Sequence, residues 1–149
     1  MRAALAVVIT ATLLVPLAGC ARTDAPPDTT DGPQPLAGEV VLVKSGGIAG
    51  LTDTVRVEPQ GQWTRTDRAG ASREGRLAEA EFARLRQLAV DPRLAAEAAV
   101  TVPATMCADA FAYRLTVAAT TVTYVDCPPR ATPPPATAEV VDLLERATS

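Results

Sequence analysis

The chain has 149 residues, with 14 basic and 17 acidic side chains, three cysteines and no histidine. This mildly acidic balance argues against nucleic-acid binding, because proteins that bind nucleic acids concentrate positive charge. The lack of histidine excludes Ser-His-Asp and Cys-His triads, histidine general bases and histidine-ligated metals. Neither a G-x-x-x-x-G-K-[ST] nor a G-x-G-x-x-G phosphate-binding motif occurs.

The first twenty residues follow the order of a secretory signal peptide. Met1-Arg2 supplies a positive charge, and an apolar run reaches Leu17. The run is too short for a membrane-spanning helix, which needs about 20 residues, and Pro16 would kink it. The segment from Leu17 to Cys20, Leu-Ala-Gly-Cys, resembles the lipobox of bacterial lipoproteins, whose cysteine sulfur receives a diacylglycerol. The alternative is an ordinary signal peptide with a chance cysteine.

The resemblance implies that residues 1–19 are a leader and that the mature protein begins at Cys20. It would then be lipid-anchored to the cell membrane, facing away from the cytoplasm. Loss of Arg2 would change the net charge from −3 to −4. Residues 20–37 contain four prolines, three aspartates and few bulky apolar side chains, which predicts an unfolded tether. Residues 38–149 are expected to form one domain of ordinary size.

The first half of this domain predicts three β-strands. Short segments rich in valine and threonine favour strands, and the second alternates, with Val55 and Val57 on one face. Between the first two strands, Ser45–Gly50 contains three glycines, which permit backbone shapes closed to other residues. Trp63 is expected in the core rather than at a contact. The predicted strands are residues 39–44, 52–58 and 62–66.

The second half predicts two helices and two further strands. One helix, residues 78–89, places Phe82, Leu85, Leu88 and Ala89 on one stripe, and the other, residues 136–146, buries Val140, Leu143 and Leu144. Strands are predicted at 111–117 and 121–125; a short strand at 75–77 and a helical turn at 93–98 remain open. The order β-β-β-α-β-β-α predicts an α+β domain, an antiparallel sheet of about five strands with two helices on one face.

Cys107 and Cys127 flank the predicted strand pair 111–125. Outside the cytoplasm two such cysteines most economically form a disulfide, worth about 3 kcal/mol on the chain-entropy model. Its reduction would leave the glycine-rich segment covalently untouched. A two-cysteine metal site is the alternative, but zinc prefers four ligands and the chain has no histidine. Asp109 is interpreted as a solvated turn residue. We expect no metal and no cofactor.

Two segments together resemble the emfourin family of small proteinaceous inhibitors of protealysin, a thermolysin-like zinc metallopeptidase. They are Val43–Leu51, with the pattern Ser-Gly-Gly-x-x-Gly-Leu, and Asp109–Val117. The likeness covers most of residues 38–147. The lipid anchor, the tether and the disulfide depart from the family pattern and indicate a surface-tethered relative. The resemblance implies that the partner-binding residues are Ser45, Gly46, Gly47, Ile48, Gly50 and Leu51.

The glycine-rich segment has two interpretations. It is either a tight turn in which glycines relieve strain, or a protruding loop with Ile48 or Leu51 as an apolar plug. Thermolysin-like enzymes favour bulky apolar residues just after the cut bond, which suits Ile48. The first functional hypothesis is therefore a lipoprotein that binds, and inhibits, a metallopeptidase; the alternative is a non-inhibitory envelope interaction protein. A carboxylate-based hydrolase is the minority hypothesis, and we expect no enzymatic activity.

Overall fold

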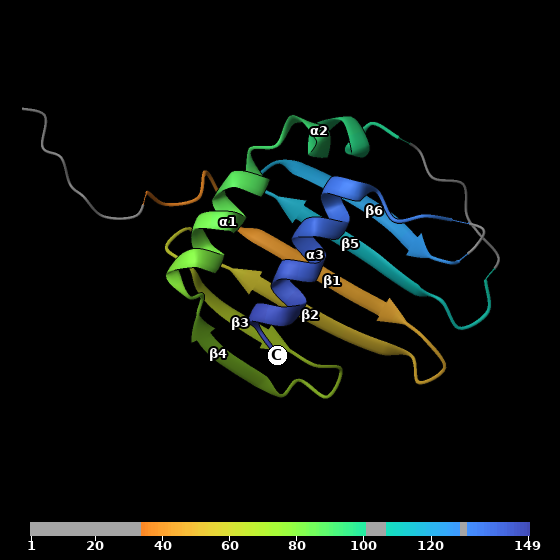
Figure 1. Cartoon of the computed structure of the whole chain (residues 1–149). Helices are drawn as coiled ribbons and strands as arrows, with labels where there is room; N and C mark the ends of the chain where they lie inside the picture. Colours follow the sequence, from red (N-terminus) through yellow and green to blue (C-terminus); the bar gives the residue numbers. More distant parts are fainter. Residues whose placement is uncertain (1–33, 101–106, 129–130) are drawn as a thin grey trace, which may run out of the picture. The chain divides into compact units, whose positions relative to one another are not determined.

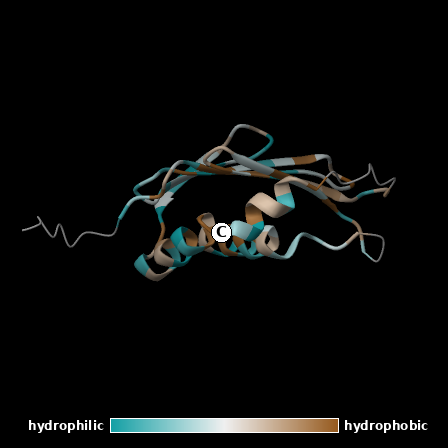
Figure 2. Cartoon of the chain, turned by 90° about the horizontal axis from the view of Figure 1, so that it is seen from above, coloured by the Kyte–Doolittle hydropathy of each residue, from teal (hydrophilic) through white to brown (hydrophobic). Residues whose placement is uncertain are grey.

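The computed structural model describes residues 34–100, 107–128 and 131–149. Within them six strands form one antiparallel sheet in the order β4-β3-β2-β1-β5-β6 (Figure 1). The strands are β1 (Val40–Gly46), β2 (Leu51–Val57), β3 (Gln62–Thr66), β4 (Ser72–Arg76), β5 (Phe111–Val117) and β6 (Thr120–Asp126). The helices are α1 (Glu79–Ala89), α2 (Pro92–Ala98) and α3 (Pro135–Ala147). They cover one face of the sheet, as Figure 2 shows. The predicted α+β class is confirmed, but the predicted sheet of about five strands with two helices is one strand and one helix short of the observed fold.

The strand β1 lies at the centre of the sheet and carries part of the core. Its residue Leu42 is 2 % exposed and pairs with Val55 of β2 on one side and Leu115 of β5 on the other. Alternate residues along these strands point to the helices, as the period of a strand requires. The core also takes in Leu36, which is buried and donates its N–H to the carbonyl of Pro59 at 2.9 Å.

The edge strand β4 is the element that the sequence pattern indicated least. Its five residues, SREGR, are polar and mostly exposed, so no alternation marks them. The strand forms because its backbone pairs with β3, and Gly75 lies opposite Trp63. A Cβ at Gly75 would lie 2.5 Å from the indole, so only glycine leaves room for it. Trp63 is half-buried against the core, as expected, and within the described residues its Nε1 has no hydrogen-bond partner.

The short helix α2 caps the longer helix α3. It begins at an Asp91 cap, whose carboxylate accepts from the N–H of Arg93 at 2.9 Å. Near its end, the Glu97 carboxylate accepts from the N–H groups of Ala136 and Thr137, both at 2.8 Å. These are first-turn donors of α3, which have no partner within their own helix. The possible helical turn at residues 93–98 is therefore part of the helix α2, which anchors the start of α3.

The helices α1 and α3 place their apolar stripes as predicted. Residues Phe82, Leu85 and Leu88 of α1 are buried. In α3 the buried residues include Val140, Leu143 and Leu144. No helix in the described parts of the chain is both long and apolar enough to cross a membrane.

Candidate functional site

The glycine-rich segment forms the turn between β1 and β2. Ser45 and Gly46 end β1, and Leu51 begins β2, so residues 47–50 are the turn itself; we call residues 46–50 the glycine loop. The N–H of Gly50 donates to the carbonyl of Gly47 at 3.0 Å and closes the turn. Ser45 is half-buried within the strand, where it pairs with Thr52 and with Ala112 of β5. The segment therefore combines two strand ends with one exposed turn.

Two of its glycines are required by the packing of the domain itself. Gly46 has φ +105°, and a Cβ there would lie 2.4 Å from the carbonyl oxygen of Ala110. Gly47 has φ +72°, and its Cβ would lie 2.8 Å from the ring of Phe111. The N–H of Gly47 also donates to the carbonyl of Ala110 at 3.1 Å. Because side chains are strained at these φ values, the tight-turn interpretation accounts for both glycines without any partner.

The same interpretation does not account for Ile48. This residue is 89 % exposed, more than the other large apolar residues that lie on the surface of the described chain. Leu51, at the foot of the same turn, is 39 % exposed. An isoleucine held in water forgoes roughly 1.5–3 kcal/mol that burial would contribute. The described residues do not bury this apolar group, so Ile48 is the strongest candidate contact on the loop.

A second turn lies beside the glycine loop at the same end of the sheet. It joins β3 to β4, and Asp67 orders it by accepting from the N–H groups of Ala69 at 2.8 Å and Ala71 at 2.9 Å. From this turn, Arg68 donates through Nη1 to the carbonyl oxygen of Ala49. Sequence reasoning missed Arg68, because no local pattern marks an arginine that reaches a turn nineteen residues earlier.

A shallow hollow of about 330 Å³ lies between these two turns. Its lining includes apolar Leu51 and the charged residues Asp53, Asp67 and Arg68. The Asp53 carboxylate is already paired with Arg65 at 3.0 Å. A larger hollow of about 550 Å³ lies where the β2–β3 turn meets the start of α1, at the opposite end of the strands; it is lined by Pro35, Gln60, Arg76, Leu77, Glu79 and Phe82. Of these two hollows, the smaller one adjoins the glycine loop, through Leu51.

On the helix face, a charged and aromatic cluster supports the strand that carries the loop. Lys44 Nζ lies 2.8 Å from the Glu145 carboxylate of α3 and 4.8 Å from the centre of the Phe111 ring. Tyr113 and Tyr124 stack beside it with ring centres 4.8 Å apart. Desolvation lowers the pKa of Lys44, but its interactions with Glu145 and Tyr113 together outweigh this effect, so the pKa is raised. Burial raises the pKa of both tyrosines.

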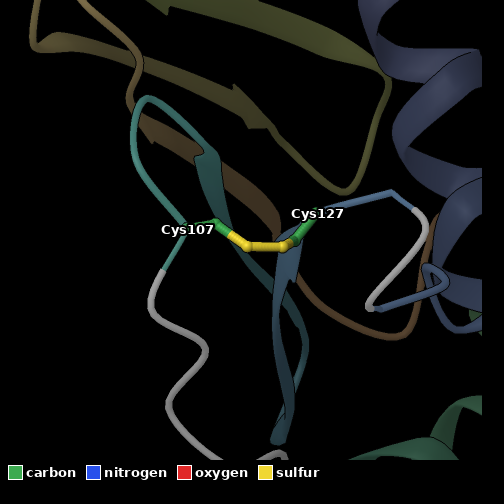
Figure 3. The surroundings of a disulfide bond; sticks show 2 residues. All are labelled: Cys107 and Cys127. Atoms are coloured by element: carbon green, nitrogen blue, oxygen red, sulfur yellow. A yellow bond between two sulfur atoms is a disulfide. The ribbon is translucent and has the colours of Figure 1, made fainter.

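The disulfide between Cys107 and Cys127 lies at the same end of the sheet. Figure 3 shows the bridge between the segment that leads into β5 and the end of β6. The two Cα atoms are 6.3 Å apart, within the usual range, and Cys127 is 5 % exposed. The predicted disulfide is confirmed. It fixes the segment that contains Asp109, whose φ is +61°, and Ala110, whose carbonyl bonds the glycine loop.

The remaining predicted site is Cys20, which lies outside the described residues. Within the described ranges 34–100, 107–128 and 131–149, no group of three or more cysteine, aspartate or glutamate side chains is placed to hold a metal ion. No protein-family model matches the chain, and no curated protein matches it.

Proposed function

We propose that this chain is a lipid-anchored extracytoplasmic protein whose emfourin-like domain binds and inhibits a thermolysin-like metallopeptidase. The lipobox at Cys20 and the Ser-Gly-Gly-x-x-Gly-Leu pattern support this proposal from the sequence. The observation that carries it is the 89 % exposure of Ile48 on a turn that neighbouring segments hold in place.

The binding cost of such a loop depends on how ordered it is beforehand. Three glycines in a free loop would raise the cost, because each must lose conformational freedom when a partner binds. Here the carbonyl of Ala110 holds Gly47 on one side, and Arg68 holds Ala49 on the other. The loop is therefore ordered before binding, and Ile48 can enter an apolar cleft with a smaller loss of entropy.

The same bonds explain how a loop can occupy a peptidase cleft without being cut. A substrate must present an extended backbone at the bond that is cleaved. Gly46 and Gly47 hold left-handed φ values of +105° and +72°, and the Gly50–Gly47 hydrogen bond keeps the backbone turned. Extending it would break that bond and the bond to Ala110. The proposed mode of action is a plug that fits the cleft but resists cleavage.

The test is titration of the purified chain into protealysin and other thermolysin-like peptidases, with a fluorogenic peptide as substrate. We expect stoichiometric inhibition by the natural chain and its loss in Ile48→Asp, which places a charge in an apolar cleft. Val90→Asp is the matched control, because Val90 is 72 % exposed and ends α1 away from the loop. Inhibition that survives Ile48→Asp would place the site elsewhere, and inhibition of no peptidase would refute the proposed activity.

The open face of the sheet favours a second candidate, an envelope interaction protein without inhibitory activity. The three helices of the described residues all lie on the other face (Figure 2), and Val41, Val43 and Val125 lie half-buried among threonines on this one. A face of this kind can receive another protein without any use of the glycine loop. Crosslinking in intact cells separates the two candidates: recovery of envelope-assembly or transport proteins without a peptidase would favour the second.

A further inference from the structure

Two turns at one end of the sheet form a single surface. The glycine loop carries Ile48, and the β3–β4 turn, residues 67–71, carries Arg68. Antiparallel pairing of β1 with β2, β2 with β3 and β3 with β4 brings the two turns to the same end. The bond from Arg68 to the carbonyl of Ala49 joins them directly. A partner that receives Ile48 therefore meets the β3–β4 turn as well.

The guanidinium of Arg68 has capacity beyond this one bond. An arginine carries five N–H donors in a planar fork, and Ala49 uses one of them. The side chain is exposed, and none of the ion pairs found among the described residues includes Arg68. Its positive charge is thus available to a carboxylate on a partner, in a chain whose own net charge is negative.

Arg68 also holds the second half of the loop, residues 48–50. Gly47 is bonded to Ala110 of the neighbouring segment, whereas the hydrogen bonds of residues 48–50 within the described part of the chain go to Gly47 and Arg68. The nearest heavy atom to a Cβ built at Gly50 is Arg68 Nη1, at 3.6 Å, so the guanidinium lies across this half of the turn. Without it, Ile48 would be carried by a loop held at one end.

We propose that the partner-binding surface spans both turns. In this surface Arg68 positions the glycine loop and also contacts the partner through its positive charge. This inference rests on the proposed function and deepens it. The surface fits a partner recess that is apolar at its centre, where Ile48 enters, and acidic along the rim that faces the β3–β4 turn. The hollow lined by Leu51 and Arg68 lies between the two turns; of the two carboxylates that also line it, Asp53 is paired with Arg65, and Asp67 accepts from two backbone N–H groups of its own turn.

Hydrogen–deuterium exchange of residues 46–51 tests the positioning role without any partner. Arg68→Ala should speed exchange there roughly tenfold, because one hydrogen bond to a charged group is lost, while the melting temperature falls by only about 5 °C and the domain stays folded. Arg68→Lys should restore part of the protection. Arg76→Ala is the matched control: Arg76 is exposed and donates to the carbonyl of Gln60 at 2.7 Å, at the opposite end of the sheet. Loop exchange in Arg68→Ala at the natural rate would overturn the inference.

Inhibition of a thermolysin-like peptidase tests the contact role. Arg68→Ala should weaken inhibition roughly tenfold or more, and Arg68→Glu should weaken it further by repulsion from the acidic rim. The Arg76→Glu variant should inhibit like the natural chain. If Arg68→Ala inhibits normally while Ile48→Asp does not, the surface is confined to the glycine loop and the inference is wrong. If Arg68→Glu is no weaker than Arg68→Ala, the rim is not acidic. A natural chain that inhibits nothing contradicts the proposed function, and the exchange experiment still decides the positioning role.

Discussion

Reduction of the Cys107–Cys127 disulfide should destabilise the domain and loosen the glycine loop. The bridge spans 20 residues, and on the chain-entropy model a closed loop of this length contributes about 3 kcal/mol to the free energy of unfolding. A domain of about 110 residues loses roughly 4 °C in melting temperature for each kcal/mol. We therefore expect the melting temperature to fall by roughly 10 °C or more on reduction. Calorimetry of the oxidised and reduced chain measures this fall.

The structure adds a local effect that covalent connectivity alone does not give. Ala110, whose carbonyl bonds the N–H of Gly47, lies three residues after Cys107, and the bridge fixes this segment against β6. Opening the bridge should therefore speed amide exchange at Gly47 at temperatures where the domain stays folded. A double variant, Cys107→Ala with Cys127→Ala, should reproduce both effects without a reducing agent.

Two results would refute this reasoning. An unchanged melting temperature after complete reduction, verified by alkylation of both thiols, would show that the bridge does not constrain the unfolded chain. Unchanged exchange at Gly47, with a lowered melting temperature, would show that the Ala110 segment keeps its position without the bridge. Intact mass gives the control, because the oxidised chain should be lighter by two hydrogen atoms.

Three further predictions concern other parts of the chain. Cys20→Ser should abolish incorporation of labelled fatty acid, and label in the variant would contradict the lipobox interpretation. Gly46→Ala should lower the free energy of unfolding by roughly 1–3 kcal/mol in urea titrations, because the new Cβ clashes at a position whose φ is already strained. Gly70→Ala, at φ +82° with nothing within 4 Å of the new Cβ, should lower it less. Equal losses in the two variants would show that the clash at Gly46 contributes nothing. The free energy of unfolding should fall as pH rises above about 10. The pKa values of Lys44 and Tyr124 are raised in the folded state, so the folded state holds protons that the unfolded state releases. Urea unfolding of Lys44→Met across this pH range should show a shallower fall, and an identical fall would exclude a contribution from Lys44.

The sequence by itself determined the elements that carry an apolar period. The alternation of Phe111–Val117 and the stripe of Phe82, Leu85 and Leu88 each require one buried face, so these segments were recognisable from residue spacing alone. The disulfide was also predictable, because two cysteines flanking a strand pair have few other uses. The α+β class follows from the order of these elements.

Only the tertiary structure decided the elements and contacts that depend on a neighbour. The edge strand β4 has no apolar period and exists through its backbone pairing with β3, while α2 is held by a single buried leucine, Leu94, and by its capping of α3. The site shows the same division: the pattern around Ile48 was visible in the sequence, but the contacts of Ala110 and Arg68 were not. Antiparallel register brings turns that are distant in sequence to one end of a sheet, and no local pattern of residues encodes that proximity.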